Sequence, residues 1–460
     1  MSVDPDYHPE SLAGRALPLP DGHTLELGEE IQRYPGKRVL LRGRLVGCDV
    51  VAKFYIGRLR GAWEWYRGLR GTRALSAAGV PSPALRWSGY VAAAGAWLTA
   101  IDYIEPDRAW PPASDTEQAA AHDDLLIALA EHHAAGIIQN DLNWTNFIPR
   151  DGRLQSIDGD RVHRRRAPLG RALSLRNLRR LYAYKADFHL DDIRAGYHAY
   201  CAHRAWQPDA AELQRLLEQV FRERRQVGER FVRRSLAGWK HFERERIGSW
   251  HALRDRRRLG HHDLFAIAPA AGTRPSAEAS EHHRKLERGT FRLRPFHRRW
   301  DARRAWQRAL LCRRLRIPAE RPAVLLEDKR VRSHVGGWLI TCAHSADTLS
   351  TVLPGRTANQ QEAIITAIGR LTGLLALAGL RFSPISATQF AVDTEADTVL
   401  LRTPEATRVT RRGDTGASGD LTALAALLAA DTTIERNAIA RALTRGMAAV
   451  VPAADEERSA

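Results

Sequence analysis

Residues 133–160 read HAAGIIQNDLNWTNFIPRDGRLQSIDGD, and this stretch decides how the first half of the chain is interpreted. Asp141 and Asn146 lie in one polar loop with the spacing D-x-x-x-x-N. Asp158 follows a short predicted hairpin that turns at Asp151-Gly152. Asp and Asn are common turn residues, so the loop alone is a weak signal. The long helix predicted before the loop and the residues further upstream determine whether the loop is interpreted as a functional site.

Phosphoryl transfer would use these residue types at this spacing. An Asp can accept or orient the proton of an attacking hydroxyl, and the Mg²⁺ that bridges ATP phosphates prefers oxygen ligands. Kinase-like folds carry these groups on a D-x-x-x-x-N loop followed by an Asp after a hairpin. We therefore predict that Asp141 is the catalytic residue, that Asn146 and Asp158 bind Mg²⁺, and that ATP is the phosphate donor.

Two upstream residues complete the expected site. Lys53 lies on a predicted strand, and Glu64 on the following predicted helix is the only acidic residue between Lys53 and Asp102. We expect both to bind the cofactor, with Glu64 pairing Lys53 beside the ATP phosphates. The alternatives are a surface lysine and a glutamate that pairs with a surface arginine. No glycine-rich loop is present, so the turn at residues 34–37 is expected to cover the phosphates instead.

Three neighbouring residues have other interpretations. Asp160 either binds metal or forms an ion pair with Arg161, and the sequence leaves both open. His132 and His133 lie on the apolar-rich predicted helix before the loop. We expect them to pack or cap this helix rather than to act as ligands.

The pattern of elements predicts a bilobal α+β fold. Short alternating runs bounded by turn signals predict a sheet of at least three strands, and apolar periodicity predicts helices before and after a further strand. The expected strands are residues 23–31, 37–47, 49–57 and 97–106, and the expected helices are about 62–78 and 118–136. The dense charge of residues 222–258 predicts either a solvated helix or a basic face for anionic lipid.

The second half repeats the first in weakened form. GLLALAGLRFSPISATQF matches the string around the catalytic loop, with Gly379, Thr388 and Phe390 falling on Gly136, Thr145 and Phe147. At the same spacing Pro384 replaces Asp141 and Gln389 replaces Asn146, while Lys285 is the candidate for a surviving small-lobe lysine. The alternative is chance similarity between Ala- and Leu-rich helices. We interpret the second half as a degenerate, pseudokinase-like copy.

These observations divide the chain into four parts. Residues 1–25 are expected to be an N-terminal extension and 26–256 a kinase-like catalytic domain. Residues 257–282 are expected to be a linker and 283–460 the degenerate kinase-like domain.

Composition limits the cellular setting. The net charge of +17 and the pI of about 10.3 favour an anionic partner, such as nucleic acid, an acidic membrane or a phosphorylated substrate. The alternative is that an Arg-rich, Lys-poor composition reflects a GC-rich genome. The 4 cysteines form no CxxC pair, so no zinc site or disulfide framework is predicted. Residues 1–10 lack a signal-peptide core and no apolar run reaches about 18 residues, so we expect a cytoplasmic protein.

The chain resembles a known family, the bacterial lipopolysaccharide core kinases. The matching pieces are VVAKFY, AGVPSP, HAAGIIQNDLNWTNF and SIDGDRVHRRRAPLGRALSLRNLRRL, which together cover roughly residues 30–240. A weaker match covers 283–410. The chain departs from the family at Gln139-Asn140, before the catalytic Asp. It also departs at Gly68, where the family has its helix glutamate and where this chain has Glu64 one turn earlier.

The resemblance implies a substrate and a location. The acceptor would be a heptose or Kdo hydroxyl of the lipopolysaccharide inner-core glycolipid, phosphorylated from ATP with Mg²⁺. The protein would work at the inner face of the cytoplasmic membrane, with peripheral contact to anionic lipid and no nucleic-acid partner. Two other functions stay open: a kinase of a small-molecule or protein acceptor, and a non-catalytic scaffold in envelope assembly. The oligomeric state is also left open.

Overall fold

The computed structural model describes most of the chain. The described residues are 12–112, 115–184, 188–239, 241–272, 282–286, 289–328, 336–342, 346–382, 385–393, 398–402, 407–409, 417–429, 432 and 434–450. They form two compact units. The N-terminal unit comprises Met1–Lys185 with Asp191–Asp209, and the C-terminal unit comprises Ala186–Leu190 with Ala210–Ala460.

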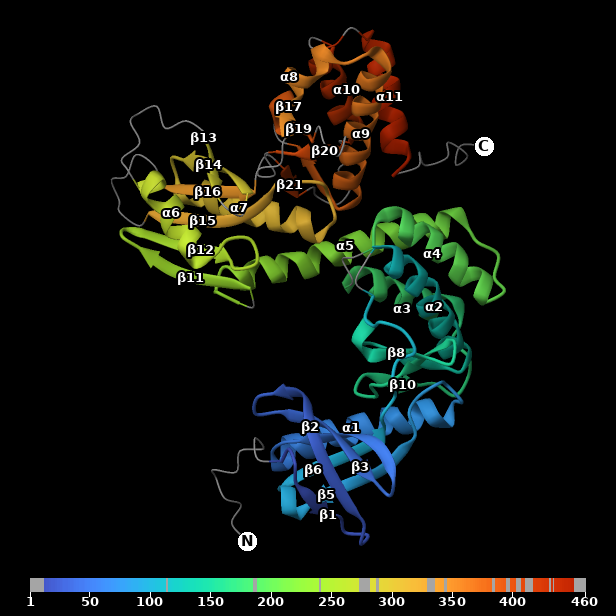
Figure 1. Ribbon diagram of the computed structural model, residues 1–460. Coiled ribbons are helices and arrows are strands. Elements are labelled where there is room, and N and C mark those ends of the chain that lie inside the picture. Colours follow the sequence, from blue (N-terminus) through green and yellow to red (C-terminus); the bar gives the residue numbers. More distant parts are fainter. Residues whose placement is uncertain are drawn as a thin grey trace. The chain divides into compact units, whose positions relative to one another are not determined.

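A six-stranded antiparallel sheet opens the N-terminal unit (Figure 1). Its order is β1-β2-β3-β4-β6-β5. The strands are β1 Ala16–Pro18, β2 Thr24–Tyr34, β3 Arg38–Leu45, β4 Cys48–Tyr55, β5 Leu85–Val91 and β6 Ala96–Asp102. Alternate residues of β3 and β4 are buried in one apolar cluster, because successive side chains of a strand point to opposite faces. The strands predicted in this region are confirmed.

The start of the chain differs from the expected loose extension. Leu12, Leu17 and Leu19 are fully or almost fully buried in the core of this sheet together with Leu25. β1 pairs antiparallel with β2, so the described residues before 26 belong to the sheet. The short β1, set among Pro and Gly residues, gives too few alternating positions to be recognised from sequence.

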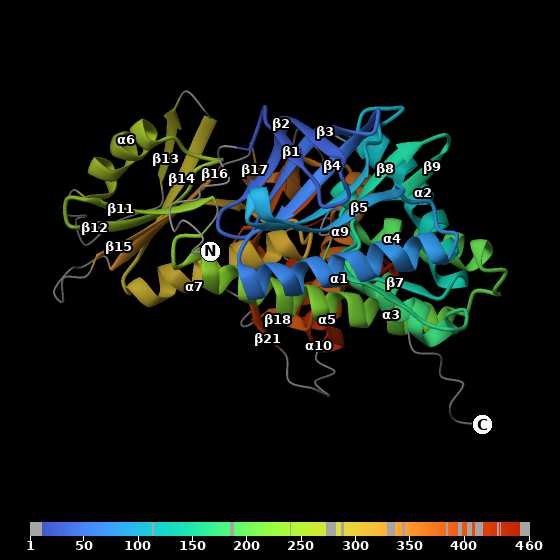
Figure 2. The ribbon, with the colours of Figure 1, turned by 90° about the horizontal axis from the view of Figure 1, so that it is seen from below.

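Helix α1, Arg58–Ala77, follows β4 and contacts both β6 and β10. It confirms the predicted helix but begins about one turn earlier. Figure 2 shows this helix along its length. Gly79 ends it in a left-handed conformation (φ 67°), which glycine adopts without steric penalty. Leu75 near its end is buried with Val80, Ile137 and Val162, so the helix spans from the sheet to the loops that follow.

The second part of the N-terminal unit carries the polar loops. Helix α2, Asp115–Ala134, ends before Gly136 (φ 75°) and is followed by two short antiparallel pairs, β7 with β10 and β8 with β9. The bounds are β7 Ile137–Gln139, η3 Trp144–Asn146, β8 Phe147–Arg150, β9 Arg153–Ser156 and β10 Val162–Arg164. Helices α3, Arg171–Tyr184, and α4, Leu190–His203, complete this part. The predicted helix, loop and hairpin are confirmed.

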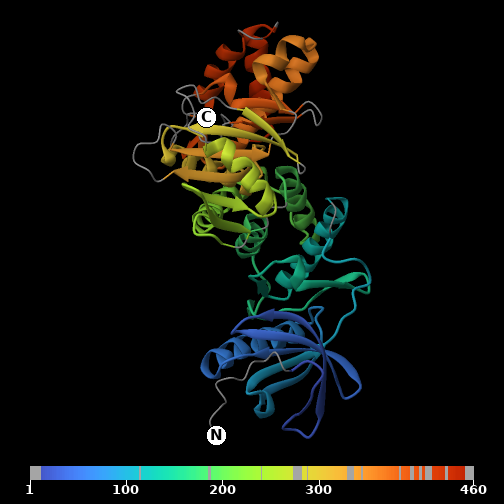
Figure 3. The same ribbon diagram turned by 60° about the vertical axis from the view of Figure 1, so that its left-hand side comes forward.

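The C-terminal unit begins with helix α5, Ala210–Ser235, and contains a second six-stranded antiparallel sheet. The order is β11-β12-β15-β16-β14-β13. The bounds are β11 Phe242–Ile247, β12 Trp250–Asp255, β13 His282–Leu286, β14 Gly289–Phe296, β15 Arg321–Asp328 and β16 Gly337–Cys342, with α6 His261–Gly272 and α7 Arg299–Arg314. Figures 1 and 3 show this sheet in yellow, with the orange-to-red part of the unit following it.

The division of the chain differs from the expected boundary at 256. β12 pairs with β15, so the charged stretch after Ser235 forms a hairpin of the second sheet instead of continuing as a helix. The expected linker, 257–282, contains helix α6, whose Leu264 and Ile267 are buried in the core of that sheet. Strong charge hid the alternation of β11, in which Phe242 is buried and the following residues are alternately half-buried and exposed.

The C-terminal unit repeats the element order of the first. The strand order β13-β14-β16-β15 corresponds to β3-β4-β6-β5, with α7 after β14 as α1 follows β4. Beyond it lie β17 Ala346–Thr348, α8 Leu349–Val352, η4 Leu353–Gly355, α9 Ala358–Leu377, β18 Leu380–Phe382, η5 Ala387–Gln389, β19 Phe390–Asp393, β20 Thr398–Leu401, β21 Thr407–Val409, α10 Ala417–Leu428 and α11 Arg436–Ala448. Gly379 after α9 is left-handed (φ 68°), like Gly136 after α2. Pro384 lies outside the described residues.

Within the described part of the chain, no helix has the length and apolar character needed to cross a membrane.

Candidate active site

Lys53 and Asp158 lie next to each other in the N-terminal unit. Lys53 is on β4, which places its side chain on the sheet face opposite the buried Ala52 and Phe54. Its Nζ lies 3.7 Å from Asp158 Oδ1 and donates a hydrogen bond to the Ile157 carbonyl at 3.1 Å. Only 9% of Lys53 is exposed. The structure therefore brings together two of the predicted site residues from distant parts of the sequence.

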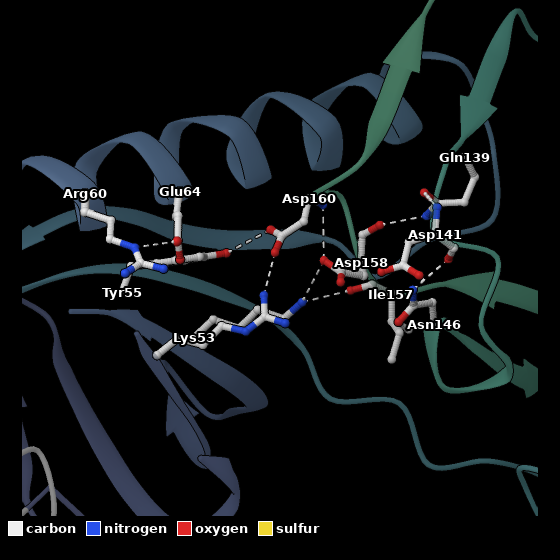
Figure 4. Close-up of polar contacts among 11 residues, drawn as sticks. Lys53, Tyr55, Arg60, Glu64, Gln139, Asp141, Asn146, Ile157, Asp158 and Asp160 are labelled. Carbon is white, nitrogen blue, oxygen red and sulfur yellow. Dashed lines mark hydrogen bonds and ion pairs between the residues drawn. The ribbon is translucent and has the colours of Figure 1, made fainter. Parts of the chain in front are cut away.

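Glu64 does not join this pair. Its carboxylate lies 3.1 Å from Arg60 Nε, one turn earlier on α1, and Figure 4 shows the two side by side. The expected Lys53–Glu64 pair is not formed. One turn later the helix has Gly68, where a Cβ would lie 2.6 Å from Asp160 Oδ1 and 2.8 Å from the Tyr55 hydroxyl oxygen. Those two side chains fill the space that a helix carboxylate would need.

The loop that carries Asp141 is held by hydrogen bonds of its own. The Asn146 Nδ2 donates to the Asp141 carbonyl at 2.7 Å, and Asn143 Nδ2 donates to Asp141 Oδ1 at 2.6 Å. The backbone N–H of Ile157 donates to the Asn146 carbonyl at 3.0 Å, which ties the loop to the residue before Asp158. Because the Asn146 amide nitrogen is engaged, its Oδ1 is the atom left to act as a ligand.

Gln139 connects the Asp141 and Asp158 loops, and the sequence interpretation gave it no such role. Its Nε2 donates to the Asp158 carbonyl at 3.0 Å, while its Oε1 accepts from the Asp141 backbone N–H at 3.2 Å. Asn177 on α3 donates to the Gln139 carbonyl at 2.9 Å. A polar residue next to the catalytic loop was the available signal, but only the fold shows what it bonds.

The two helix histidines are structural, as predicted. His133 is hydrogen-bonded to Tyr200 and Asn177, and His132 to Ser156. Burial lowers the pKa of His132 to about 3 and that of His133 to about 4, so both are neutral at physiological pH.

The donor set fits a magnesium ion held jointly with phosphate. No group of three or more His, Cys, Asp or Glu side chains arranged to hold a metal occurs among the described residues. Mg²⁺ needs few protein ligands, because it keeps waters and is bound through one or two carboxylates plus substrate phosphates. Asp158 and the Asn146 amide oxygen supply hard oxygen donors of this kind. Figure 4 shows both beside Asp141.

Asp160 forms an ion pair with Arg38 on β3 rather than with Arg161. Arg38 Nη1 lies 2.5 Å from Asp160 Oδ2, and the Tyr55 hydroxyl donates to Asp160 Oδ1 at 3.5 Å. Burial raises the pKa of Asp160, and the charge of Asp158 adds to this, while Lys53 and Arg38 act in the opposite direction. Burial opposes the charge of Arg38, but the Asp160 and Asp158 carboxylates outweigh it and raise its pKa.

A basic segment follows this pair. The exposed residues Arg161, Arg164, Arg165 and Arg166 lie just before, at the end of and just after β10, whose partner β7 leads into the Asp141 loop. The Asn140 backbone N–H donates to the Arg161 carbonyl at 3.1 Å, so the segment begins directly beside the catalytic loop.

The corresponding place in the C-terminal unit is closed by a buried ion pair. Arg292 on β14 donates to the Arg402 carbonyl at 3.0 Å, much as Lys53 donates to the Ile157 carbonyl. Its Nη2 also lies 2.5 Å from Glu320 Oε2, which accepts from Thr341 Oγ1 at 2.9 Å. Burial raises the pKa of Glu320 to about 7 despite Arg292.

Two further sequence expectations concern this unit. Lys285 is exposed on the edge strand β13, so Arg292 occupies the inner position expected for a small-lobe lysine. Gln389 ends η5 and its backbone carbonyl accepts from the Arg402 N–H at 2.7 Å, as Asn146 accepts from Ile157.

Comparisons with known proteins give partial matches only. No protein-family model matches the sequence, and no curated protein matches it. Among solved structures, WaaP in complex with acyl carrier protein is 20% identical, with a TM-score of 0.30, covering 43% of this chain and 88% of that one. The PknI kinase domain of M. tuberculosis is 16% identical, with a TM-score of 0.23, covering 30% and 58%. An aminoglycoside phosphotransferase described as putative, from Ralstonia eutropha, is 12% identical, with a TM-score of 0.33, covering 50% and 88%.

Proposed function

We propose that the N-terminal unit is an ATP-dependent phosphotransferase with a hydroxyl acceptor. The observation that carries the proposal is the gathering of Lys53, Asp158, Asn146 and Asp141 from a strand, a hairpin end and one loop. The side chains present match what phosphoryl transfer needs: a cation for the phosphates, oxygen ligands for Mg²⁺ and a carboxylate for the acceptor proton.

Each residue has a distinct part in the reaction. Lys53 would bind the non-transferred phosphates, and Asp158 with Asn146 would hold Mg²⁺, which would supply positive charge to the transferring phosphoryl group. Asp141 accepts a hydrogen bond from the acceptor hydroxyl and orients its oxygen in line with the γ-phosphorus. It takes up the proton as the new P–O bond forms and the bond from the γ-phosphorus to the β-phosphate oxygen breaks, with ADP as the leaving group. The turn at residues 34–37 joins β2 to β3 beside this place and is assigned to cover the phosphates.

We assign the acceptor to an inner-core lipopolysaccharide sugar, a heptose or Kdo. The sequence resemblance to core kinases supports this assignment, and so does the exposed basic segment next to the Asp141 loop. No described carboxylate forms an ion pair with Arg161, Arg164, Arg165 or Arg166. These guanidinium groups suit an acceptor rich in phosphate and carboxylate, which arginine recognises with bidentate geometry. Contact with the anionic inner face of the cytoplasmic membrane belongs to the same proposal.

The C-terminal unit is proposed to be a pseudokinase-like partner of the first. Its repeated strand order supports a shared origin, and the Arg292–Glu320 pair supports loss of nucleotide binding. Arg292 takes the place of Lys53, but its partner Glu320 is a buried carboxylate next to Thr341 and not a candidate metal ligand such as Asp158. The unit would then stabilise or position the N-terminal unit rather than catalyse.

Transfer of ³²P from labelled ATP tests the proposal. Deep-core lipopolysaccharide that lacks inner-core phosphate should be labelled by the full chain, and an Asp141→Asn variant should not label it. Aminoglycosides and a peptide mixture serve as competing acceptors. Labelling of one of these alone would move the assignment to another acceptor. Mg²⁺-dependent ATP binding without transfer to any acceptor would favour the non-catalytic scaffold.

A further inference from the structure

Helix α1 packs closely against the Asp158 loop at two glycines, Gly71 on the helix and Gly159 on the loop. A Cβ at Gly71 would lie 1.9 Å from the Gly159 carbonyl oxygen, and a Cβ at Gly159 would lie 2.5 Å from the Gly68 carbonyl oxygen. These distances leave no room for a side chain at either glycine. The helix therefore cannot send a carboxylate to Lys53 from this face, and Glu64 is already turned toward Arg60.

The sheet provides the connection instead. Arg38 is directly opposite Tyr55 in the β3–β4 register, and both side chains reach Asp160. Arg38 and Asp160 are mostly buried, with 22% and 13% of their side chains exposed. Opposite charges held this close in a partly desolvated place interact far more strongly than a surface pair.

Asp160 passes this constraint to Asp158. The Asp160 backbone N–H donates to Asp158 Oδ1 at 3.1 Å, and that same oxygen faces Lys53. Moving Asp160 would therefore turn the carboxylate that is proposed to bind Mg²⁺. Arg38 lies one residue after the turn at 34–37, so it also fixes the start of the strand that carries the phosphate-covering turn.

We propose that Arg38 is a positioning residue which acts through Asp160 to hold Asp158 in the orientation that binds Mg²⁺, in place of a glutamate on the helix. The inference rests on the proposed function, because it assumes that Asp158 is a metal ligand. Arg38 is then a cation outside the D-x-x-x-x-N loop that supports the site, and Asp160 is a carboxylate that orients the metal ligand without binding the metal.

A double-mutant cycle on the full chain tests this assignment. The variants are Arg38→Gln, Asp160→Ala and the double variant, and binding of ATP is titrated calorimetrically at several Mg²⁺ concentrations and in EDTA. Each single change should weaken Mg-ATP binding on the order of tenfold and raise the Mg²⁺ concentration needed for half-maximal binding. The double variant should be no weaker than either single one, and metal-free ATP binding should change little.

Controls separate this role from general stability. Arg42→Gln removes the exposed Arg42–Asp49 pair on the same strand and should leave the Mg²⁺ requirement unchanged. Arg38→Lys should restore part of the loss. Asp160→Asn replaces Asp160→Ala if thermal melting shows that the alanine variant does not fold.

The possible outcomes distinguish a failure of the Arg38 assignment from a failure of the proposed phosphotransferase function. A wild-type chain that binds no Mg-ATP contradicts the proposed function and removes the basis of the inference. A wild-type chain that binds Mg-ATP, together with an Arg38→Gln variant of the same affinity, overturns the inference alone. Losses that multiply in the double variant would also overturn it, because they would mean that Arg38 contacts the nucleotide directly instead of acting through Asp160.

Discussion

The Lys53 ammonium lies 3.7 Å from the Asp158 carboxylate and joins strand β4 to the end of the β8–β9 hairpin. In the proposed reaction each member of this pair has another partner, phosphate for Lys53 and Mg²⁺ for Asp158. Mg-ATP would therefore bind between two groups that already face each other. This is pre-organisation, since neither side chain has to be brought from solvent.

Changes to the two carboxylates of the proposed site, Asp141 and Asp158, should have different effects. Asp141→Asn keeps the shape of the loop but removes the proton acceptor, so kcat should fall about 10²- to 10⁴-fold with Mg-ATP affinity retained. Asp158→Asn should weaken Mg-ATP binding itself. Calorimetric binding and ³²P transfer, measured on both variants, check the split. Normal turnover by Asp141→Asn on the true acceptor would refute the catalytic assignment.

Changes to Lys53 and to Glu64 should have different effects on activity, because the two side chains do not form a pair. Lys53→Met removes the ammonium but keeps an apolar stem, so kcat/KM for ATP should fall strongly without unfolding. Glu64→Gln removes only a helix ion pair with the exposed Arg60, worth about 0.3–0.5 kcal/mol, and should leave kcat/KM within about twofold. Steady-state kinetics decide between them. A loss in Glu64→Gln as large as that in Lys53→Met would restore the helix glutamate as the partner of Lys53.

Gly71→Ala should disturb the active site through packing alone. The new Cβ would meet the Gly159 carbonyl at 1.9 Å, so helix and loop must separate, at a cost of about 1–3 kcal/mol or more. Unfolding in urea and Mg-ATP binding should both be affected. Gly170→Ala is the matched control, because nothing lies within 4 Å of its Cβ position and it should be nearly neutral.

The buried histidine His133 should make the N-terminal unit acid-sensitive. Its Nε2 donates to Asn177 Oδ1 and its Nδ1 accepts from the Tyr200 hydroxyl, which itself accepts from Arg204. Protonation would place a second donor against Tyr200. Burial lowers the pKa of His133 to about 4 from its usual 6.5. A depressed pKa contributes stability that is present above pH 6.5 and is lost as pH falls toward 4.

The size of this effect is on the order of 3 kcal/mol across that pH range. Urea unfolding at pH 7, 6, 5 and 4 measures it. His133→Gln keeps a donor and an acceptor but does not titrate, so its stability should fall less steeply over the same range. Parallel pH curves for the wild type and this variant would contradict the prediction.

The C-terminal unit should contribute no turnover. Adding Arg292→Met to a full chain with Asp141→Asn should leave the residual transfer of that chain unchanged, because Arg292 is held by Glu320 in the second unit. Residual transfer that disappears on adding Arg292→Met would overturn the pseudokinase-like assignment. Any separate C-terminal fragment should begin at residue 210 rather than near 275, because β11 and β12 belong to the second sheet.

The sequence predicted the main strands, the helices and the polar loop at Asp141 of the N-terminal unit because each has a local signal. Lys53 and Asp158 could be brought together from the order of motifs alone. The Arg38–Asp160 pair could not, because 122 residues separate its members and neither belongs to a recognised motif. Glu64 was expected to pair with Lys53 by elimination, and the contact of Gly68 with Asp160 shows why it does not.

The backbone contact between α1 and Gly159 bears on regulation. Gly71 and the Gly159 carbonyl lie too close for a side chain between them, so a swing of α1 toward the loop must move the Gly159 peptide, and Asp158 with it. The helix of the N-terminal unit therefore cannot rotate toward the loop while the loop stays in place, so this movement cannot switch the unit on and off. An allosteric inhibitor would have to displace helix and loop as one body, and we expect the supply of acceptor, rather than a helix switch, to set the flux.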